Sequence, residues 1–213
     1  MQEELCKPLG AEFYIGLPDG FPEDRLAKVQ GISSPLQVFK HMHELTIGML
    51  LGFLNPGSLT SRSMVDKKRL VGNNNFNNRE MLSIEFPSGN GIGEVRGMAQ
   101  IYSEFATGGR SLGLSAETLS ELQRPAEPPA RGWHDRVIRM DLGYSLGFWK
   151  PIATRKFGSS LHAFGHPGAG GSFCFADPEM KVGYAYALNK IGGYMDNNPR
   201  ENNVRNAFYN CIQ

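Results

Sequence analysis

The sequence has no excess of charge of either sign and no long apolar run. Lysine and arginine together number 22 against 21 aspartates and glutamates in 213 residues, so the formal net charge is +1. A chain so close to neutrality carries no overall charge signal for nucleic acid or for a membrane surface. Its longest apolar run, Ile47–Leu54, is far shorter than the roughly 20 residues that span a bilayer. We therefore expect a soluble protein with no nucleic-acid partner and no membrane span.

Cysteine is scarce, and a targeting signal is missing. Cys6, Cys174 and Cys211 are widely spaced and form no Cys-x-x-Cys pair, which argues against a disulfide framework and a structural zinc site. We expect each to act as a small buried apolar residue. The opening MQEELCKPLG has neither the basic nor the apolar part of a signal peptide. The localisation stays open, with the cytoplasm favoured by the unpaired cysteines and the missing signal.

Metal and cofactor motifs are also missing. His41 and His43 lie two residues apart on a predicted helix, so their side chains face different ways and do not form a ligand pair. The glycine clusters GNGIG and GAGGS lack the surroundings of a dinucleotide site and of a phosphate-binding loop, respectively. The sequence predicts no metal site and no cofactor.

Helical patterns dominate residues 1–140. The first ten residues resemble the end of a helix, because Pro8 and Gly10 stop it and no helix start precedes it. Apolar residues at helical spacing predict one continuous helix from Ser34-Pro35 up to Asn55. A second helix is predicted to open at Ser88–Gly91 and to end at Gly108-Gly109.

Strand patterns replace them in residues 141–213. Between residues 144 and 188, short apolar runs broken by glycines predict an antiparallel meander. A C-terminal helix begins at Asn198-Pro199 and should cover one face of that sheet with an apolar stripe of Val204, Ala207, Phe208 and Cys211. The fold class is α+β, an antiparallel sheet flanked by helices in a single domain over residues 1–213.

The stretch GYSLG at 143–147 matches the Gly-x-Ser-x-Gly elbow that carries the nucleophile of α/β-hydrolases. That elbow needs a helix directly after the serine, whereas the following Phe-Trp-Lys-Pro predicts a strand and a break. No aspartate or glutamate lies between Ser145 and His166, so the order serine, acid, histidine fails. We favour a half-buried strand here.

A second candidate for a chemical role is the stretch His166-Pro-Gly168-Ala169, which connects two of the predicted strands. A bare backbone at Gly168 would let a substrate lie flat against the sheet. The Ala169 amide could then point at a developing oxyanion, with His166 hydrogen-bonding into the same cleft. The residues alone allow another interpretation, a structural turn with a satisfied histidine.

The stretch GHPGAGGSFCFADPEMKVGYAYALNK at 165–190 resembles the C-terminal signature of the serine β-lactamase-like family, which includes class C β-lactamases, related esterases and penicillin-binding proteins. The resemblance is to the branch in which His-x-Gly replaces Lys-Thr/Ser-Gly. Three other stretches resemble further segments of the family in the same order: EELCKPLGAEFYIGLP, FPSGNGIGEVRGMAQIYSEFATGG and GYSLGFW. The resemblance therefore extends over nearly the whole chain.

The resemblance implies a nucleophilic serine in a Ser-x-x-Lys motif and a proton-shuttling Tyr-x-Asn motif. In this sequence no lysine has a serine three residues before it, and no tyrosine has an asparagine two residues after it. In the family's order both motifs would precede Met1. The expected chain is thus a C-terminal fragment of a β-lactamase/transpeptidase-like fold whose N-terminal part is missing. Only His166 in a supporting role, Gly168, and the Ala169 amide as an oxyanion donor carry over.

The implied function is that of a serine hydrolase, which transfers an acyl group from a small-molecule ester or amide through an acyl-enzyme in a full-length parent. The chain alone is expected to be inactive because it lacks the nucleophile. The alternative is a non-catalytic β-lactamase-like module, a pseudoenzyme or scaffold that keeps the fold. An α/β-hydrolase that uses Ser145 ranks below both. Nothing in the sequence indicates the substrate or the oligomeric state.

Overall fold

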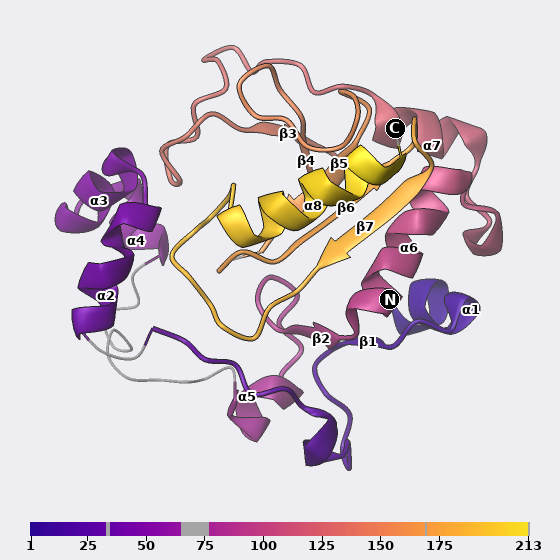
Figure 1. Cartoon of the computed structure of the whole chain (residues 1–213), viewed down its shortest axis with the longest axis horizontal. Coiled ribbons are helices and arrows are strands. Elements are labelled where there is room, and N and C mark those ends of the chain that lie inside the picture. Colours follow the sequence, from indigo (N-terminus) through magenta and orange to yellow (C-terminus); the bar gives the residue numbers. More distant parts are fainter. Residues whose placement is uncertain (33–34, 65–76, 169, 213) are drawn as a thin grey trace.

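The centre of the molecule is a five-stranded antiparallel sheet with the strand order β3-β4-β5-β6-β7 (Figure 1). The computed structural model describes residues 1–32, 35–64, 77–168 and 170–212. Neighbours in the sheet are neighbours in the sequence, so the predicted meander is confirmed. The strands are β3 (Gly143–Ser145), β4 (Phe148–Lys150), β5 (Phe164–Pro167), β6 (Phe173–Asp177) and β7 (Val182–Tyr186).

Most helices of the described residues precede this sheet in the chain, and α8 (Pro199–Ile212) follows it. A small antiparallel pair of strands, β1 (Phe13–Ile15) and β2 (Gly91–Gly93), lies among them. The α-helices are α1 (Lys7–Leu9), α2 (Pro35–His41), α3 (Ile47–Leu54), α4 (Leu59–Met64), α5 (Arg79–Ser83), α6 (Val95–Thr107) and α7 (Ala116–Gln123). Short turns of other helix types are η1 (Gln2–Cys6), η2 (Glu23–Arg25), η3 (Met42–Glu44) and η5 (Arg110–Leu112).

Helices cover both faces of the sheet. On one face Tyr102 and Ala106 of α6 pack against Phe164 and Ala176 of the strands. On the other face, Tyr209 of α8 packs on a buried cluster made of Leu142, Trp149, Phe157, Ala163, Phe173, Phe175 and Tyr184. The antiparallel sheet is therefore flanked by helices in an α+β arrangement, as the sequence predicts, and the structure adds that helices and sheet form three layers.

At Gly183 the backbone of β7 lies directly against the backbone of α6. A Cβ atom at Gly183 of β7 would lie 2.1 Å from the backbone nitrogen of Ser103 and 2.4 Å from the carbonyl oxygen of Ala99. Both contacts are with backbone atoms of α6, which cannot rotate out of the way. Glycine is therefore required at this position by the close approach of helix and strand.

The α8 layer is held by a buried carboxylate. Asp177 at the end of β6 has no exposed surface. It accepts hydrogen bonds from the Tyr209 hydroxyl of α8 at 2.6 Å and from the backbone and side chain of Ser159 at 2.6 and 2.8 Å. A buried carboxylate needs several donors to offset its lost hydration. Asp177 thus joins α8, the sheet and the loop before β5 at one point.

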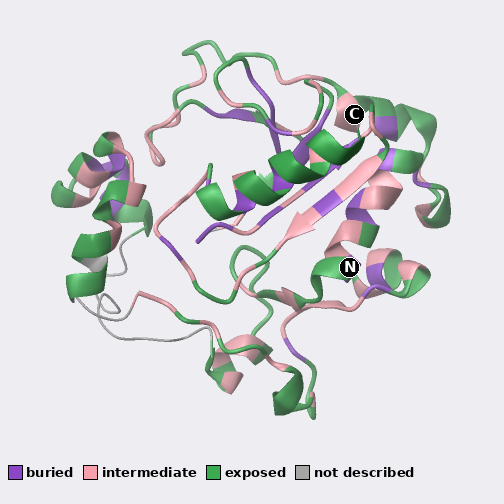
Figure 2. Cartoon of the chain, viewed as in Figure 1, coloured by how far each residue is buried: buried purple, intermediate pink, exposed green. Residues whose placement is uncertain are grey.

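The prediction for the buried stripe of α8 is wrong. Figure 2 shows that α8 is largely exposed. Val204 and Phe208 are 51% and 37% exposed, and Ala207 and Cys211 are exposed as well. The face turned to the sheet instead carries Glu201, Arg205 and Tyr209, which are spaced by four residues along the helix. The Arg205 guanidinium donates to Glu201 at 2.8 Å and lies 5.7 Å from the centre of the Phe173 ring. Mutual pairing and the aromatic ring make the burial of these charges tolerable.

The long helix expected over residues 35–54 is broken into α2, η3 and α3. The break comes at Leu45, which is extended with φ −92° and ψ 147°. Thr46 then caps α3, because its hydroxyl oxygen accepts a hydrogen bond from the Met49 amide at 3.2 Å. The helix expected to open at residues 88–91 begins only at Val95, since Gly91–Gly93 pairs with β1 as a strand. Its end at Gly108, with φ +107°, is confirmed.

Lys150 on β4 is the largest of the fully buried side chains, at 2% exposure. Its ammonium group donates to the carbonyl oxygen of Leu122 near the end of α7 and lies 4.8 Å from the centre of the Phe164 ring. A carbonyl at a helix C-terminus is a favourable partner for a cation. Burial lowers the pKa of Lys150 from 10.5 to about 8.

None of the helices in the described part of the chain has the length and apolar content needed to cross a bilayer.

Candidate active site

The hairpin of β3 and β4 carries the hydroxyl group that bonds the ring of His166. Its two turn residues, Leu146 and Gly147, both have positive φ, 49° and 82°. This is the geometry of the tight hairpin turns that match the twist of antiparallel strands. It places Tyr144 opposite Trp149, and Trp149 in turn pairs with Gly165 of β5. This pairing places Tyr144 close to His166, the residue that follows Gly165.

The ring of His166 is exposed on β5 beside the two aromatic side chains. The ring centre of His166 is 5.8 Å from that of Tyr144 and 5.6 Å from that of Trp149. Its Nε2 atom forms a hydrogen bond with the Tyr144 hydroxyl, and its Nδ1 atom lies 2.6 Å from the carbonyl oxygen of Pro167. Both ring nitrogens therefore have partners.

These partners define the tautomer of the neutral imidazole. A carbonyl oxygen only accepts, so the Nδ1 atom of His166 carries the proton and donates it to Pro167. The Nε2 atom is then an acceptor, and the Tyr144 hydroxyl donates to it. Burial raises the pKa of the Tyr144 phenol, which keeps that donor protonated.

Gly168 follows at the end of the strand and opens a tight turn into β6. Its amide donates to the carbonyl oxygen of Ser172 at 2.7 Å, and the Gly171 amide donates to Gly168 at 3.1 Å. A Cβ atom at Gly168 would lie 2.1 Å from the Ser172 hydroxyl oxygen. The turn thus gives a structural reason for glycine here, in addition to the bare backbone expected from the sequence. Ala169 lies outside the described residues.

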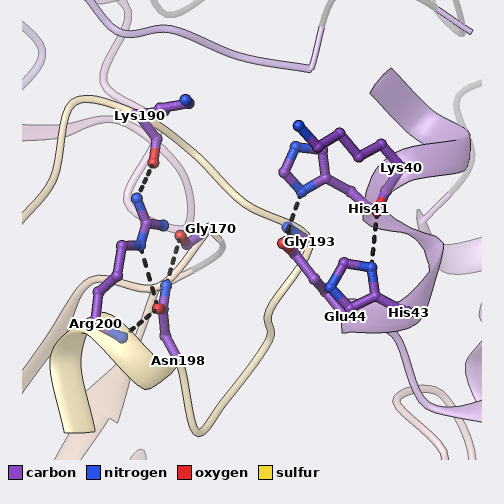
Figure 3. A network of polar contacts seen from close by, with 9 residues as sticks. All are labelled: Lys40, His41, His43, Glu44, Gly170, Lys190, Gly193, Asn198 and Arg200. Atoms are coloured by element: carbon purple, nitrogen blue, oxygen red, sulfur yellow. Dashed lines mark hydrogen bonds and ion pairs between the residues drawn. The ribbon is translucent and has the colours of Figure 1, made fainter. Parts of the chain in front are cut away.

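The turn is braced from outside by the segment that leads into α8 (Figure 3). Asn198, 2% exposed, donates to the Gly170 carbonyl oxygen at 3.4 Å and accepts from the Arg200 amide at 3.0 Å. Arg200 also donates to the carbonyl oxygen of Lys190 at 3.0 Å. On the other side of this segment, the Gly193 amide donates to Glu44. The glycine turn after His166 is therefore tied to both α8 and η3.

A cavity of about 310 Å³ lies beside His166 and Gly168. Met98 and Tyr102 of α6, Phe13 of β1 and Cys174 of β6 contribute to its lining, as do β7 and the backbone around β2. Burial raises the pKa of Cys174 to about 12 and raises that of Tyr102. Cys174 is therefore a neutral thiol at physiological pH and not an activated nucleophile.

The structure brings together two of the three predicted site residues, His166 and Gly168, at this cavity. Ser145 ends β3 and is followed by the hairpin turn and not by a helix, as expected. Tyr144, the hydrogen-bond partner of His166, is not predicted from the sequence, although it stands in the same GYSLG stretch. The hairpin register, readable from Leu146-Gly147, was the available signal. Among the residues that the structure describes, no three histidine, cysteine, aspartate or glutamate side chains converge as a metal site.

The comparisons with known proteins decide the family. The family model described as Beta-lactamase matches residues 1–207. The chain belongs to the Beta-lactamase family. The Esterase/beta-lactamase LipL of Mycobacterium tuberculosis (strain ATCC 25618 / H37Rv) is 27% identical over 201 residues, which cover 89% of this chain and 42% of the relative.

Solved structures agree with this Beta-lactamase assignment. A family VIII carboxylesterase superposes with a TM-score of 0.65 at 27% identity, over 98% of this chain and 50% of that protein. EstA from Arthrobacter nitroguajacolicus Rue61a gives a TM-score of 0.72 at 25% identity, over 99% and 52%. A penicillin-binding protein homolog from Caulobacter crescentus gives 0.64 at 26% identity, over 98% and 50%. The chain thus spans about half the length of the relatives that it matches.

Proposed function

We propose that this chain forms the His-x-Gly wall of a serine-hydrolase site that cleaves small-molecule esters through an acyl-enzyme. The nucleophilic serine and its lysine would come from polypeptide that this sequence does not contain. The supporting observation is the ordered hydrogen-bond chain from Tyr144 through His166 to Pro167, at the edge of a cavity that His166 lines. Membership of the Beta-lactamase family supplies the reaction class.

In this proposal His166 has a supporting role. Its ring is fixed in one tautomer, with Nε2 as the acceptor, so it can hold a hydroxyl group in place or exchange a proton with it. The Gly168 amide is already bonded within the turn. The next amide, at Ala169, is therefore the oxyanion donor we propose, on the strength of the resemblance.

The lining of the cavity favours an ester over a carboxylate-bearing β-lactam. Among the described residues that line it, Glu94 is the one with a charged side chain, and no lysine or arginine is present. A substrate carboxylate would find no cationic side chain in the lining, and it would approach Glu94, whose negative charge is only partly offset by Arg25 at 3.9 Å. A neutral ester meets neither penalty.

The test compares the chain alone with a parent protein that carries Ser-x-x-Lys. The chain alone should hydrolyse neither nitrocefin nor p-nitrophenyl butyrate. In the parent, His166→Ala should lower kcat for the ester by about 10²-fold, the size typical of a lost proton-transfer partner. Tyr144→Phe should have a smaller effect in the same direction, since it removes the donor to Nε2. Ester hydrolysis within about twofold of wild type in His166→Ala would show that the ring is structural.

A second candidate function is a non-catalytic module that keeps the fold. It is favoured by the lack of any lysine with a serine three residues before it. A parent protein that also lacks Ser-x-x-Lys would support this candidate. Labelling of the chain by a fluorophosphonate probe at Ser145 would contradict both candidates and would point to the α/β-hydrolase mechanism.

A further inference from the structure

Trp149 on β4 carries a buried hydrogen-bond donor for which the structure shows no acceptor. The side chain is 4% exposed, and its Nε1 atom has no hydrogen-bond partner among the described residues. A buried N–H group without an acceptor is costly, because it has given up its hydrogen bond to water. Such groups are rare in folded proteins, so this one needs an explanation.

Trp149 packs on both rings of the hydrogen-bonded pair at the candidate active site. The centre of its ring system lies 6.1 Å from that of Tyr144, with the two planes at 64°, and 5.6 Å from that of His166. The residue paired with Trp149 on β5 is Gly165, which has no side chain that could separate the indole from the His166 ring. The indole is therefore in contact with the Tyr144–His166 pair on its buried side.

The Tyr144 hydroxyl offers the acceptor that Trp149 lacks. In the pair with His166 this hydroxyl is the donor, because the Nε2 atom of the ring is unprotonated. A phenolic oxygen also accepts hydrogen bonds, and no described residue donates one to it. Burial raises the pKa of the Tyr144 phenol, and Trp149 acts in the opposite direction, as a donor directed at the phenol oxygen does.

We propose that the Trp149 N–H group donates to the Tyr144 hydroxyl oxygen and makes Trp149 a positioning residue of the candidate active site. With the bonds already described, this contact forms one chain of donors that runs from Trp149 through Tyr144 and His166 to the Pro167 carbonyl oxygen. Hydrogen bonds in such a chain polarise and strengthen one another. The Tyr144 proton is then directed at Nε2, which keeps the His166 ring protonated at Nδ1.

The register of the sheet excludes the other buried hydroxyl as the partner of Trp149. Tyr184 is 8% exposed, and its hydroxyl also has no partner among the described residues. It stands in the same row of paired residues, but on β7, with Gly165 and Phe175 between it and Trp149. Three strand spacings separate the two backbones by about 14 Å. Tyr184 is therefore a matched control, a buried tyrosine of the same cluster that is out of reach.

The direct test is the indole N–H signal of Trp149 in proton–nitrogen NMR spectra of the chain itself. The sequence has two tryptophans, so Trp133, in the loop before β3, is an internal reference. Tyr144→Phe keeps the ring and removes the acceptor oxygen, and Tyr144 is 48% exposed, so little repacking is needed. The Trp149 N–H should then exchange with solvent about tenfold faster, as expected for the loss of one hydrogen bond. Tyr184→Phe should leave its exchange within about twofold of wild type.

A second test follows the consequence for His166. Trp149→Phe keeps an aromatic ring in the sheet and removes the donor. Long-range proton–nitrogen spectra should show the wild-type His166 ring protonated at Nδ1, and the ring of the variant as a mixture of both tautomers. In a parent protein with Ser-x-x-Lys, Trp149→Phe should lower kcat for p-nitrophenyl butyrate about tenfold and leave KM within about twofold of wild type. This last expectation rests on the proposed function, whereas the hydrogen bond and the tautomer do not.

Three results would overturn the proposal. One is an exchange rate of the Trp149 N–H in Tyr144→Phe within about twofold of wild type. Another is an equal acceleration in Tyr184→Phe. The third is an unchanged His166 tautomer in Trp149→Phe, with near-UV circular dichroism as the check that the variant is folded. A parent that does not hydrolyse esters would contradict the proposed function and leave the NMR result standing. Activity lost in His166→Ala but kept in Trp149→Phe would overturn the positioning role alone.

Discussion

Replacing Lys150 by methionine should remove a pH dependence of stability that the wild-type chain shows above neutral pH. The Lys150 side chain is 2% exposed, and its ammonium group has the Leu122 carbonyl oxygen and the Phe164 ring as partners. No ion pair joins it to a carboxylate of the described residues. Methionine has a similar volume and no charge, so the packing of β4 should survive the change.

The sign and the size follow from the lowered pKa of about 8 against the ordinary 10.5. Below about pH 8 both the folded and the unfolded state carry the proton, and the folded state bears the full cost of burying it, roughly 3 kcal/mol. Between about pH 8 and 10.5 the unfolded chain binds a proton that the folded chain has released, so the free energy of unfolding rises with pH. From about pH 7.5 to about 9.5 the expected rise is about 2 kcal/mol.

Urea unfolding followed by tryptophan fluorescence at several pH values in this range measures the effect. Over this range the free energy of unfolding of Lys150→Met should change by about 2 kcal/mol less favourably than that of the wild type. The difference between the two proteins is the quantity to compare, because the Cys174 thiol, whose pKa burial raises from 9.0 to about 12, lowers the stability of both equally above about pH 9. Lys7→Met is the control, because the Lys7 side chain is 65% exposed and its removal should leave the slope unchanged. Buried tyrosines with raised pKa values lower the stability only above about pH 10, outside the range used. Equal slopes in wild type and Lys150→Met would refute the burial of a charged ammonium group.

Three further predictions concern the layers around the sheet. Asp177→Asn should lower the free energy of unfolding by about 2–4 kcal/mol in urea titrations, because an amide cannot accept from all four donors that the carboxylate serves; a change below about 0.5 kcal/mol would contradict the network. Gly183→Ala should cost about 3 kcal/mol, since the added methyl group meets the α6 backbone; a neutral result in thermal melts would show that α6 can shift. The chain should bind the dye ANS at the exposed face of α8, and Val204→Glu with Phe208→Glu should weaken the fluorescence; unchanged fluorescence would place the dye elsewhere.

The sequence predicts the sheet well because turn chemistry there is local. Glycines and turn residues punctuate short apolar runs, so the meander and the helix start at Asn198-Pro199 can be read without knowledge of distant contacts. The place of His166 at the end of a strand followed by a turn is predicted for the same reason. Its role as an active-site residue stays a prediction, as do Gly168 and Ala169.

The sequence predicts poorly whatever depends on contacts between distant residues. The buried face of α8 was misplaced because helical periodicity counts apolar residues, whereas this face consists of Glu201, Arg205 and Tyr209. Their burial becomes favourable only beside Phe173 and Asp177 of the sheet. Tyr144 was missed because its partner is 22 residues away, and the two meet through strand pairing. The break of the helix at Leu45 could not be predicted from the sequence, because apolar residues keep their helical spacing on both sides of it.

The backbone contact at Gly183 has a consequence for how much variation the molecule can absorb. Where two layers touch through side chains, each substitution in the core moves them slightly apart or together. Here the separation of α6 and β7 at Gly183 is set by main-chain atoms, whose size does not depend on the side chains packed around them. Both elements line the cavity beside His166, so we expect its depth to respond less to the size of side chains farther along the interface than to a change at Gly183. Because Gly183 sets the distance between α6 and β7 by backbone contact, we expect the size of the site to depend little on which side chains fill the core.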